Sequence, residues 1–327
     1  MSFRWLLDTR PIWANADSSD PEFLKALHLI PLADQTAVRK YIHASDRKLS
    51  LGSHLLKRLA VVKTYSSTPW SEVVFTADEN RKPCYCPQRV YSDESEDANQ
   101  KPKLQFNVSH QAGLVALIGS QSSGTLSQSQ VQQQCGIDIV CVNERDDHNA
   151  VRKAGSFTAW VDMFAEVFSA REMDNIRCGP EYLEQSGAMN EKESEKEVLD
   201  MKLRLFYAHW CLKEAYIKMQ GEALLADWLQ ELEFRDVRAP RPSPPSSSTL
   251  GKDAWGEVVS DFSIWRAGKK VEGVKMELCA FEERFMIATA VASMPSTSTS
   301  TASTNMSFPP FQVLDVEKDI YPYAGRK

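Results

Sequence analysis

The sequence has no uninterrupted apolar run of the length that crosses a membrane, about 20 residues. The segment Met1–Asp8 is too short and too soon charged for a signal peptide, and it is better interpreted as a first strand. Basic residues are not in excess, because 38 Lys and Arg residues stand against 44 Asp and Glu residues for a net charge of −6. We therefore expect no membrane association and no general binding of nucleic acid.

Paired cysteine motifs are also missing. The seven cysteines are scattered, none of them forms a Cys-x-x-Cys pair, and Cys84 and Cys86 have no partner cluster. This argues against a zinc site and against a disulfide framework, and it favours a reducing, cytoplasmic compartment. With 327 residues, of which 43% are hydrophobic, the chain is long enough for two domains or one large domain.

Short strands and helices alternate along the chain. We expect helices at about Ser45–Lys63, Phe157–Phe168 and Met201–Met219, and strands at Met1–Asp8, Val73–Phe75, Leu114–Gly119, Gly136–Val142, Leu232–Val237, Phe262–Ala267, Val274–Phe281 and Phe285–Val291. Gly52 lies inside the first helix, where its missing side chain would permit another backbone to approach closely.

Several segments between these elements are rich in Ser, Thr, Gln, Pro or acidic residues. We expect them to be solvated loops: Ser92–Gln100, Gln121–Gln134, Gly179–Glu197, Ala239–Thr249 and Ser293–Ser307. The sequence from Phe308 to Tyr323 turns apolar again, so this tail is expected to pack back on the body.

The segment His209–Lys218 carries the most chemistry. If it is a helix, Trp210, Glu214 and Lys218 share one face, because they are four residues apart. One interpretation is a favourable Glu-to-Lys pair on a solvated surface. The tryptophan on the same face argues against full exposure, because a large aromatic residue usually marks a half-buried face.

A second acid stands inside the apolar segment Gly136–Val142. A lone carboxylate such as Asp138 in these surroundings is costly unless it is paired, hydrogen-bonded or bound to a metal. It could be a structural Asp that caps a turn or meets an Arg. The metal interpretation needs a second carboxylate from elsewhere, and Glu214 is the obvious candidate.

A third segment, Asn107–His110, lies between two apolar strands. Ser109 and His110 can offer a hydroxyl, ring nitrogens and backbone N–H groups to a phosphate, or they can simply belong to a tight turn. No Gly-x-Ser-x-Gly elbow surrounds Ser109, so the Ser-His pair is no evidence for a hydrolase. Together the three segments suit a divalent metal and a phosphorylated substrate.

These segments resemble the signature motifs of the 4′-phosphopantetheinyl transferases, in the two-lobed, monomeric, surfactin-type branch. The motifs are Phe106–His110, Gly136–Ile139 and Trp210–Lys218, in this order along the chain. Phe75–Cys84 resembles the family's Gly-Lys-Pro region, with Arg81 in place of the glycine, and Val167–Glu172 resembles its Phe-Ser-x-x-Glu segment. The Ser/Thr-rich insertions are similar to those of broad-range members from filamentous fungi.

The resemblance implies an α+β fold of two similar lobes related by a pseudo-twofold axis, each a small, mainly antiparallel sheet packed with helices. It places residues 1–134 in an amino-terminal lobe on the coenzyme A side, and residues 135–327 in a carboxyl-terminal lobe with the metal-ligand and catalytic motifs. We see no convincing internal repeat, so the pseudo-twofold axis comes from the resemblance alone.

The resemblance also implies the reaction. A Mg²⁺-dependent holo-[acyl-carrier-protein] synthase moves the 4′-phosphopantetheine arm of coenzyme A to a serine of apo acyl or peptidyl carrier proteins, and 3′,5′-ADP leaves. The acceptors would be fatty acid, polyketide and non-ribosomal peptide synthases, and also an enzyme of lysine biosynthesis. Coenzyme A would be the co-substrate, Mg²⁺ the cofactor, and the protein a cytoplasmic monomer.

Site residues follow from the matched motifs. The resemblance implies catalytic roles for Glu172, Lys218 and His110, metal coordination by Asp138 and Glu214, and coenzyme A contacts by Arg47, Lys48, Arg81, Lys82, Pro83, Ser109, His110, Asp138, Lys213 and Lys218. Glu172 resembles the family's candidate general base, and Arg47 and Lys48 match the residues for the 3′-phosphate better than Arg39 and Lys40 do.

One position departs from the pattern. Several family members carry a metal-binding Glu two residues after the motif Asp, where this chain has Val140. Val140 weakens metal affinity in principle but does not exclude catalysis. A catalytically idle module that binds coenzyme A or a carrier protein is kept as an alternative, although Asp138, Glu172, Glu214 and Lys218 together argue against it. A Mg²⁺-dependent nucleotide-pyrophosphate transferase with a different acceptor is a further alternative.

Overall fold

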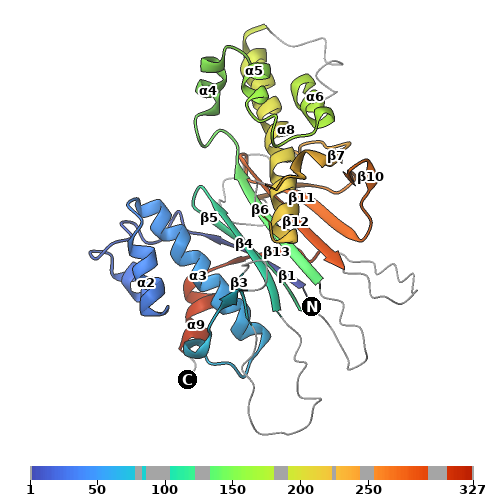
Figure 1. Ribbon diagram of the computed structural model, residues 1–327. Coiled ribbons are helices and arrows are strands. Elements are labelled where there is room, and N and C mark those ends of the chain that lie inside the picture. Colours follow the sequence, from blue (N-terminus) through green and yellow to red (C-terminus); the bar gives the residue numbers. More distant parts are fainter. Residues whose placement is uncertain are drawn as a thin grey trace, which may run out of the picture. The chain divides into compact units, whose positions relative to one another are not determined.

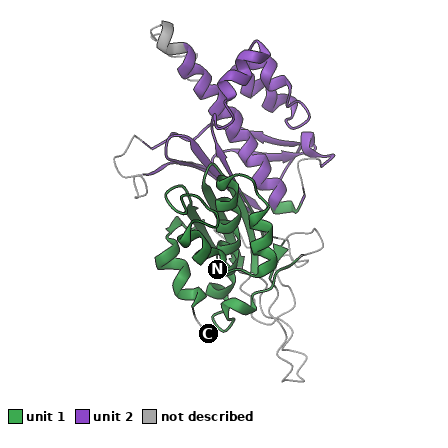
Figure 2. Cartoon of the chain, turned by 90° about the vertical axis from the view of Figure 1, so that its left-hand side faces the viewer, with its two compact units in different colours: residues 1–137, 219–221, 291–327 green, residues 138–218, 222–290 purple. Residues whose placement is uncertain are grey.

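The chain divides into two compact units in the computed structural model (Figures 1 and 2). The structure describes residues 2–77, 83–85, 104–121, 133–179, 191–222, 226–243, 254–293 and 308–325. Unit 1 contains Met1–Ile137, Met219–Gly221 and Val291–Lys327, and unit 2 contains Asp138–Lys218 and Glu222–Ala290. Among the described residues, no helix has both the length and the apolar character needed to cross a membrane.

A four-stranded sheet forms the centre of unit 1. Its strand order is β13-β1-β5-β4, with β1 at Ser2–Asp8, β4 at Leu104–Gln111, β5 at Leu114–Gln121 and β13 at Phe311–Leu314. All neighbours are antiparallel except β1 and β13, which pair in parallel with Leu7 opposite Leu314. The remaining elements of this unit are α1 (Pro21–Leu27), α2 (Leu32–Arg39), α3 (Ala44–Thr64), η1 (Trp70–Glu72), β2 (Thr76–Ala77), β3 (Pro83–Cys84), η5 (Val316–Ile320) and α9 (Tyr321–Ala324).

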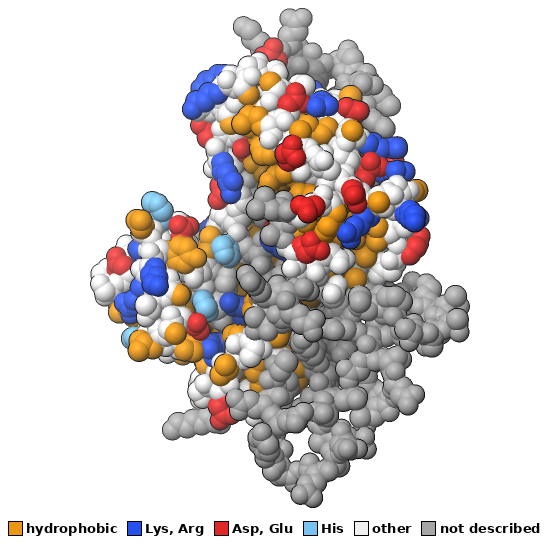
Figure 3. Space-filling view, viewed as in Figure 1, with side chains coloured by type: hydrophobic (Ala, Val, Ile, Leu, Met, Phe, Trp, Pro, Cys, Tyr) orange, Lys and Arg blue, Asp and Glu red, His pale blue; other side chains and the backbone are white. Residues whose placement is uncertain are grey.

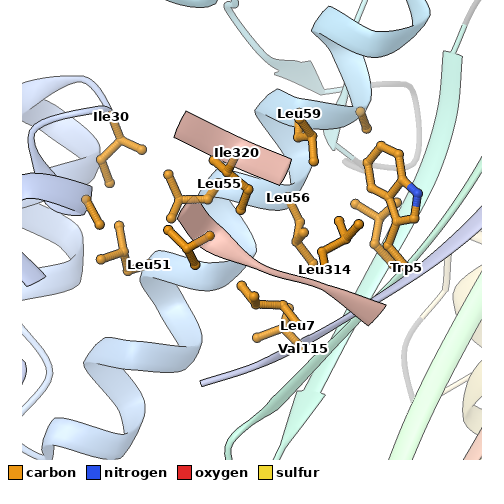
Figure 4. Packing of buried hydrophobic residues seen from close by; sticks show 14 of the residues in the cluster. Trp5, Leu7, Ile30, Leu51, Leu55, Leu56, Leu59, Val115, Leu314 and Ile320 are labelled. Atoms are coloured by element: carbon orange, nitrogen blue, oxygen red, sulfur yellow. The ribbon is translucent and has the colours of Figure 1, made fainter. Parts of the chain in front are cut away.

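Helix α3 packs on this sheet and supplies much of the core. Leu51, Leu55 and Leu59 are fully buried, and they meet residues from the sheet and from the carboxyl-terminal segment (Figure 4). A Cβ atom on Gly52 would lie 3.1 Å from Cγ2 of Val115. The close neighbours of Gly52 are thus side chains of the sheet and its flank, not the backbone that the sequence analysis expected, and an added Cβ would force them to shift.

Unit 2 is built on a second four-stranded sheet and a long helix. The strand order is β6-β12-β11-β8, with β6 at Gln133–Cys141, β8 at Trp255–Val259, β11 at Val274–Phe281 and β12 at Phe285–Ser293. A three-stranded sheet has the order β10-β9-β7, with β7 at Leu232–Arg235, β9 at Ser263–Arg266 and β10 at Lys269–Lys270. The helices are α4 (Asp147–Ala154), α5 (Phe157–Asp162), α6 (Ala170–Cys178), α8 (Glu191–Gln220) and η3 (Leu229–Glu231).

The predicted α+β class with mainly antiparallel sheets is confirmed. The pseudo-twofold relation between lobes stays a prediction. The tail after β12 differs from the expected division, because β13 pairs with β1 and residues 291–327 thus belong to unit 1.

Three of the expected elements differ in the structure. Residues Val73–Phe75 are not a strand, because buried Arg58 donates hydrogen bonds to the carbonyl oxygens of Trp70 and Val73. The helix expected at Phe157–Phe168 ends at Asp162, and the residues after it form turns. Helix α8 begins at Glu191, so the end of the predicted loop Gly179–Glu197 is helical.

The other expected loops lie largely outside the described residues. These are Ser92–Gln100, most of Gln121–Gln134, most of Ala239–Thr249 and nearly all of Ser293–Ser307. On the described surface that Figure 3 shows, acidic, basic and hydrophobic side chains are interspersed in both units.

Candidate active site

The carboxyl-terminal half of α8 lies against β6 and brings three predicted residues together. Nζ of Lys218 lies 2.6 Å from Oδ1 of Asp138 and 3.9 Å from Oε2 of Glu214. The side chains of Asp138, Glu214 and Lys218 keep 7%, 16% and 28% of their surface exposed, so the cluster is largely desolvated but reachable. The geometry favours a site over a solvated surface pair.

Two residues that the sequence analysis assigned no role hold the backbone around Asp138. The thiol of Cys211 donates to the carbonyl oxygen of Asp138 at 3.4 Å, which ties β6 to α8. In unit 1, Oδ1 of Asn107 accepts from the backbone N–H of Ile137 at 2.9 Å, directly before Asp138. Their place inside the motifs was the available signal, because a small thiol and a side-chain amide suit backbone contacts.

The charges of this cluster support one another. Burial raises the pKa of Glu214, and the nearby Asp138 carboxylate raises it further, against the effect of Lys218. Burial on its own would lower the pKa of Lys218, but Asp138 and Glu214 hold it above its ordinary value. Two carboxylates that share one cation form an environment that selects positive charge.

A divalent metal fits this donor set. The ammonium group of Lys218 already acts as a cation between the two carboxylates, at 2.6 Å and 3.9 Å. Among the described residues, no three His, Cys, Asp or Glu side chains gather into a metal cluster. Val140, which stands two residues after Asp138 on β6, is only 2% exposed and offers no ligand. Two carboxylates suit Mg²⁺, which commonly takes its other ligands from phosphates and water.

Glu172 and Lys213 are placed differently from the prediction. Both are completely buried, and Nζ of Lys213 lies 2.9 Å from Oε2 of Glu172. Lys213 also donates to the carbonyl oxygens of Leu229 and Leu232. A general base must reach the carrier serine and a phosphate contact must reach coenzyme A, but neither side chain reaches solvent in the structure.

The predicted contacts in unit 1 lie on β4 and α3. Ser109 is buried and His110 is exposed on β4. The guanidinium group of Arg47 is used within the unit, because it donates to the carbonyl oxygens of Ala16, Tyr41 and Ile42.

Lys48 is the better placed of the two predicted phosphate contacts. Its ammonium group is 3.5 Å from the carbonyl oxygen of Arg10. Burial lowers its pKa, while the charges of Asp20 and Asp8 act in the opposite direction. Arg81 and Lys82 lie outside the described residues, and Pro83 begins β3 with its ring exposed.

Comparison with known proteins agrees with the motifs. Residues 13–122 match the family model described as "4'-phosphopantetheinyl transferase, N-terminal", and residues 134–264 match the "4'-phosphopantetheinyl transferase superfamily". The chain is 40% identical to 4'-phosphopantetheinyl transferase A of Aspergillus fumigatus, over 88% of this chain and 82% of the relative. It is 37% identical to the 4'-phosphopantetheinyl transferase of Aureobasidium melanogenum, over 98% of this chain and 97% of the relative.

A more distant mammalian relative covers most of the chain as well. The chain is 25% identical to the L-aminoadipate-semialdehyde dehydrogenase-phosphopantetheinyl transferase of Mus musculus, over 84% of this chain and 70% of the relative. Coverage by both family models and identity of about 40% to fungal relatives leave no ambiguity about the class. The chain belongs to the 4′-phosphopantetheinyl transferase superfamily.

Proposed function

We propose that this chain transfers the 4′-phosphopantetheine arm of coenzyme A to a serine hydroxyl of apo carrier proteins. The serine oxygen forms a bond to the β-phosphorus of coenzyme A, and the bond from that phosphorus to the bridging oxygen breaks. The hydroxyl proton is lost and 3′,5′-ADP leaves. Phosphoryl transfer of this kind depends mostly on positioning and on neutralising charge on the phosphate oxygens.

Residues of unit 2 would supply that neutralisation. Asp138 and Glu214 would hold Mg²⁺, which when bound neutralises charge on the phosphate oxygens. Lys218 sits between the same two carboxylates, so its ammonium group is within reach of the phosphates that the site would hold. His110, Ser109 and Lys48 remain proposed contacts to coenzyme A, and Arg81, Lys82 and Pro83 remain proposed as its Gly-Lys-Pro-like segment.

The acceptors are proposed from the relatives. The fungal relatives are named 4'-phosphopantetheinyl transferases, and the mammalian relative is named L-aminoadipate-semialdehyde dehydrogenase-phosphopantetheinyl transferase. We infer a broad range that covers carrier domains of fatty acid, polyketide and non-ribosomal peptide synthases and a carrier of lysine biosynthesis. The protein would act as a cytoplasmic monomer, because the seven cysteines form no paired motif and one chain carries all the matched motifs.

One observation carries the proposal: Asp138, Glu214 and Lys218 form a single cluster in a chain that both family models match. The test is the intact mass of apo carrier proteins of several synthase types after incubation with this protein, coenzyme A and Mg²⁺. Each carrier should gain one phosphopantetheine, and a carrier with its serine changed to Ala should gain none. If no carrier gains mass while coenzyme A still binds, the chain is an idle binding module instead.

A further inference from the structure

The buried pair of Glu172 and Lys213 touches four separate segments of unit 2. Glu172 lies in the first turn of α6, and its Oε2 accepts a hydrogen bond from the N–H of Ser169 at 2.8 Å in a capping box. Its Oε1 accepts from the N–H of Phe234 on β7 at 2.9 Å. Lys213 lies on α8, and its ammonium group donates to the carbonyl oxygens of Leu229, the first residue of η3, and of Leu232, the first residue of β7. One ion pair thus connects α6, η3 and β7 to α8.

A third side chain completes the arrangement. His209 stands one turn before Lys213 on α8, and its Nδ1 lies 3.7 Å from Oε1 of Glu172. Its Nε2 is 2.9 Å from Oδ1 of Asn175 on α6. His209 is 1% exposed, so α8 is held against α6 at two successive turns by polar contacts that water does not weaken.

The position of Lys213 in α8 determines which way the next residue, Glu214, points. Lys213 directly precedes Glu214, and consecutive residues of an α-helix point about 100° apart. Lys213 is fixed towards η3 and Glu172, and Glu214 then faces Lys218 and the strand that carries Asp138. A rotation or shift of α8 that moved Glu214 away from Asp138 would have to pull the ammonium group of Lys213 from three buried acceptors.

We propose that Glu172 and Lys213 are positioning residues, which lock α8 so that Glu214 and Lys218 meet Asp138. This inference rests on the proposed function, because its predicted effects on kcat require that the chain is a transferase. It gives Glu172 a different part from that of a general base, because both carboxylate oxygens already accept hydrogen bonds in a site without exposed surface.

The test uses three variants of the full chain: Glu172→Gln, Lys213→Met and the double variant. Each single change leaves one buried charge without its partner, whereas the double variant leaves neither. A misplacement of about 1 Å at a catalytic group costs about a hundredfold in rate, so each single variant should lose about that factor in kcat. The double variant should regain at least about tenfold over the weaker single variant, because two mutations in one contact do not add.

Two measurements separate positioning from the other roles. The affinity for Mn²⁺ alone, followed by the electron paramagnetic resonance of the free ion, should fall in both single variants and recover in the double variant. Tyr207→Phe is the matched control, because it removes one hydrogen bond to Asp147 from the same helix, about two turns before Glu214. This control should lower Tm without changing Mn²⁺ affinity or kcat.

Two outcomes would overturn the proposal. If Glu172→Gln loses activity with unchanged Mn²⁺ affinity, and the double variant is equally inactive, Glu172 is the base. If the single variants only lower Tm, as Tyr207→Phe does, the pair is merely structural. Should Lys213→Met fail to fold, Glu172→Gln against the control still makes the same distinction. Failure of the proposed function is recognised separately, because the wild-type protein itself would then modify no carrier.

Discussion

Lys218 pairs more closely with Asp138, a residue 80 positions earlier in the chain, than with its helical neighbour Glu214. The distance to Asp138 is 2.6 Å, whereas that to Glu214, four residues before it, is 3.9 Å. A helical Glu-Lys pair on a surface contributes only about 0.2–0.5 kcal/mol. The longer-range contact therefore decides the interpretation of Lys218, because it links the helix to the strand within the candidate site.

We expect Lys218→Ala to lower the transfer rate by about a hundredfold or more, as for other groups that stabilise charge in the transition state. Stability should also fall, by about 1–3 kcal/mol, because Asp138 and Glu214 lose the cation between them. Added Mg²⁺ should restore much of the Tm but not the rate. Lys196→Ala, at an exposed position of the same helix, is the control. An unchanged rate with a slightly lower Tm would assign Lys218 to helix stability alone.

Asp138→Asn and Glu214→Gln should each abolish turnover while the protein stays folded, since each change removes one of the two proposed ligands of Mg²⁺. In the absence of metal, Glu214→Gln should be at least as stable as the wild type, because burial and the Asp138 carboxylate already disfavour the charge of Glu214. Asp138→Asn should be less stable, because it removes the carboxylate that lies 2.6 Å from the ammonium group of Lys218. Thermal unfolding with and without Mg²⁺ checks this directly. A variant that keeps full activity, or an increase of Tm with Mg²⁺ equal to that of the wild type, would remove that residue from the metal site.

Titration of His54 should make the stability of unit 1 depend on pH. Burial lowers the pKa of His54 from 6.5 to about 4, and the charges of Lys57 and Arg58 act in the same direction. The carboxylate of Asp34, whose Oδ2 lies 3.5 Å from Nδ1 of His54, only partly opposes this shift. The unfolded chain takes up a proton near pH 6.5, and the folded protein does so only near pH 4. Stability should thus be unaffected above pH 6.5 and fall by about 3 kcal/mol as the pH drops through this window.

The measurement is urea unfolding of the wild type and His54→Gln between pH 4 and pH 8, the range that spans the two pKa values. The free energy of unfolding of the wild type, measured relative to that of this variant, should decrease below pH 6.5 and stay constant above it. His43→Gln, at an exposed position just before α3, should show no such trend. A constant difference between wild type and His54→Gln across the whole range would contradict the prediction.

The close approach at Gly52 gives a prediction for the core. A new Cβ would lie 3.1 Å from Val115 and 3.3 Å from both Leu7 and Thr9. Gly52→Val should therefore lower stability by about 1–3 kcal/mol through overpacking. Ser45→Val, at an exposed position of the same helix, should have little effect. Equal stability of the two variants in chemical unfolding would mean that the sheet and α3 separate easily.

Three of the predicted site residues lie together in the structure, and their roles stay predictions. Glu214 and Lys218 share a face because of the helical spacing, whereas Asp138 meets them only because β6 packs against α8. Glu172 and Lys213 are equally polar and stand in equally specific motifs, yet they are buried. The sequence did contain a signal, since Lys213 stands among residues that are mostly apolar and buried in the structure: Ala208, Cys211, Leu212, Ala215, Tyr216 and Ile217.

Elements of the fold were predicted best where a long periodic pattern exists. Helix α3 and strands β5, β6 and β11 lie within a few residues of their expected places. The segment Val73–Phe75 has a β-rich composition but is not a strand. Its backbone partner is the guanidinium group of Arg58, 15 residues away from Val73, and no local pattern reveals such a contact.

The parallel pairing of β1 with β13 means that the sheet of unit 1 is completed late in synthesis. Its first strand emerges at Ser2–Asp8, but the edge it needs is supplied by Phe311–Leu314, after the whole of unit 2 has been made. Until then β1 presents an unpaired edge, which is a template for wrong pairing with other chains. A nascent or truncated chain that ends before Phe311 should consequently depend on chaperones, while the described strands of unit 2 have all been made by then.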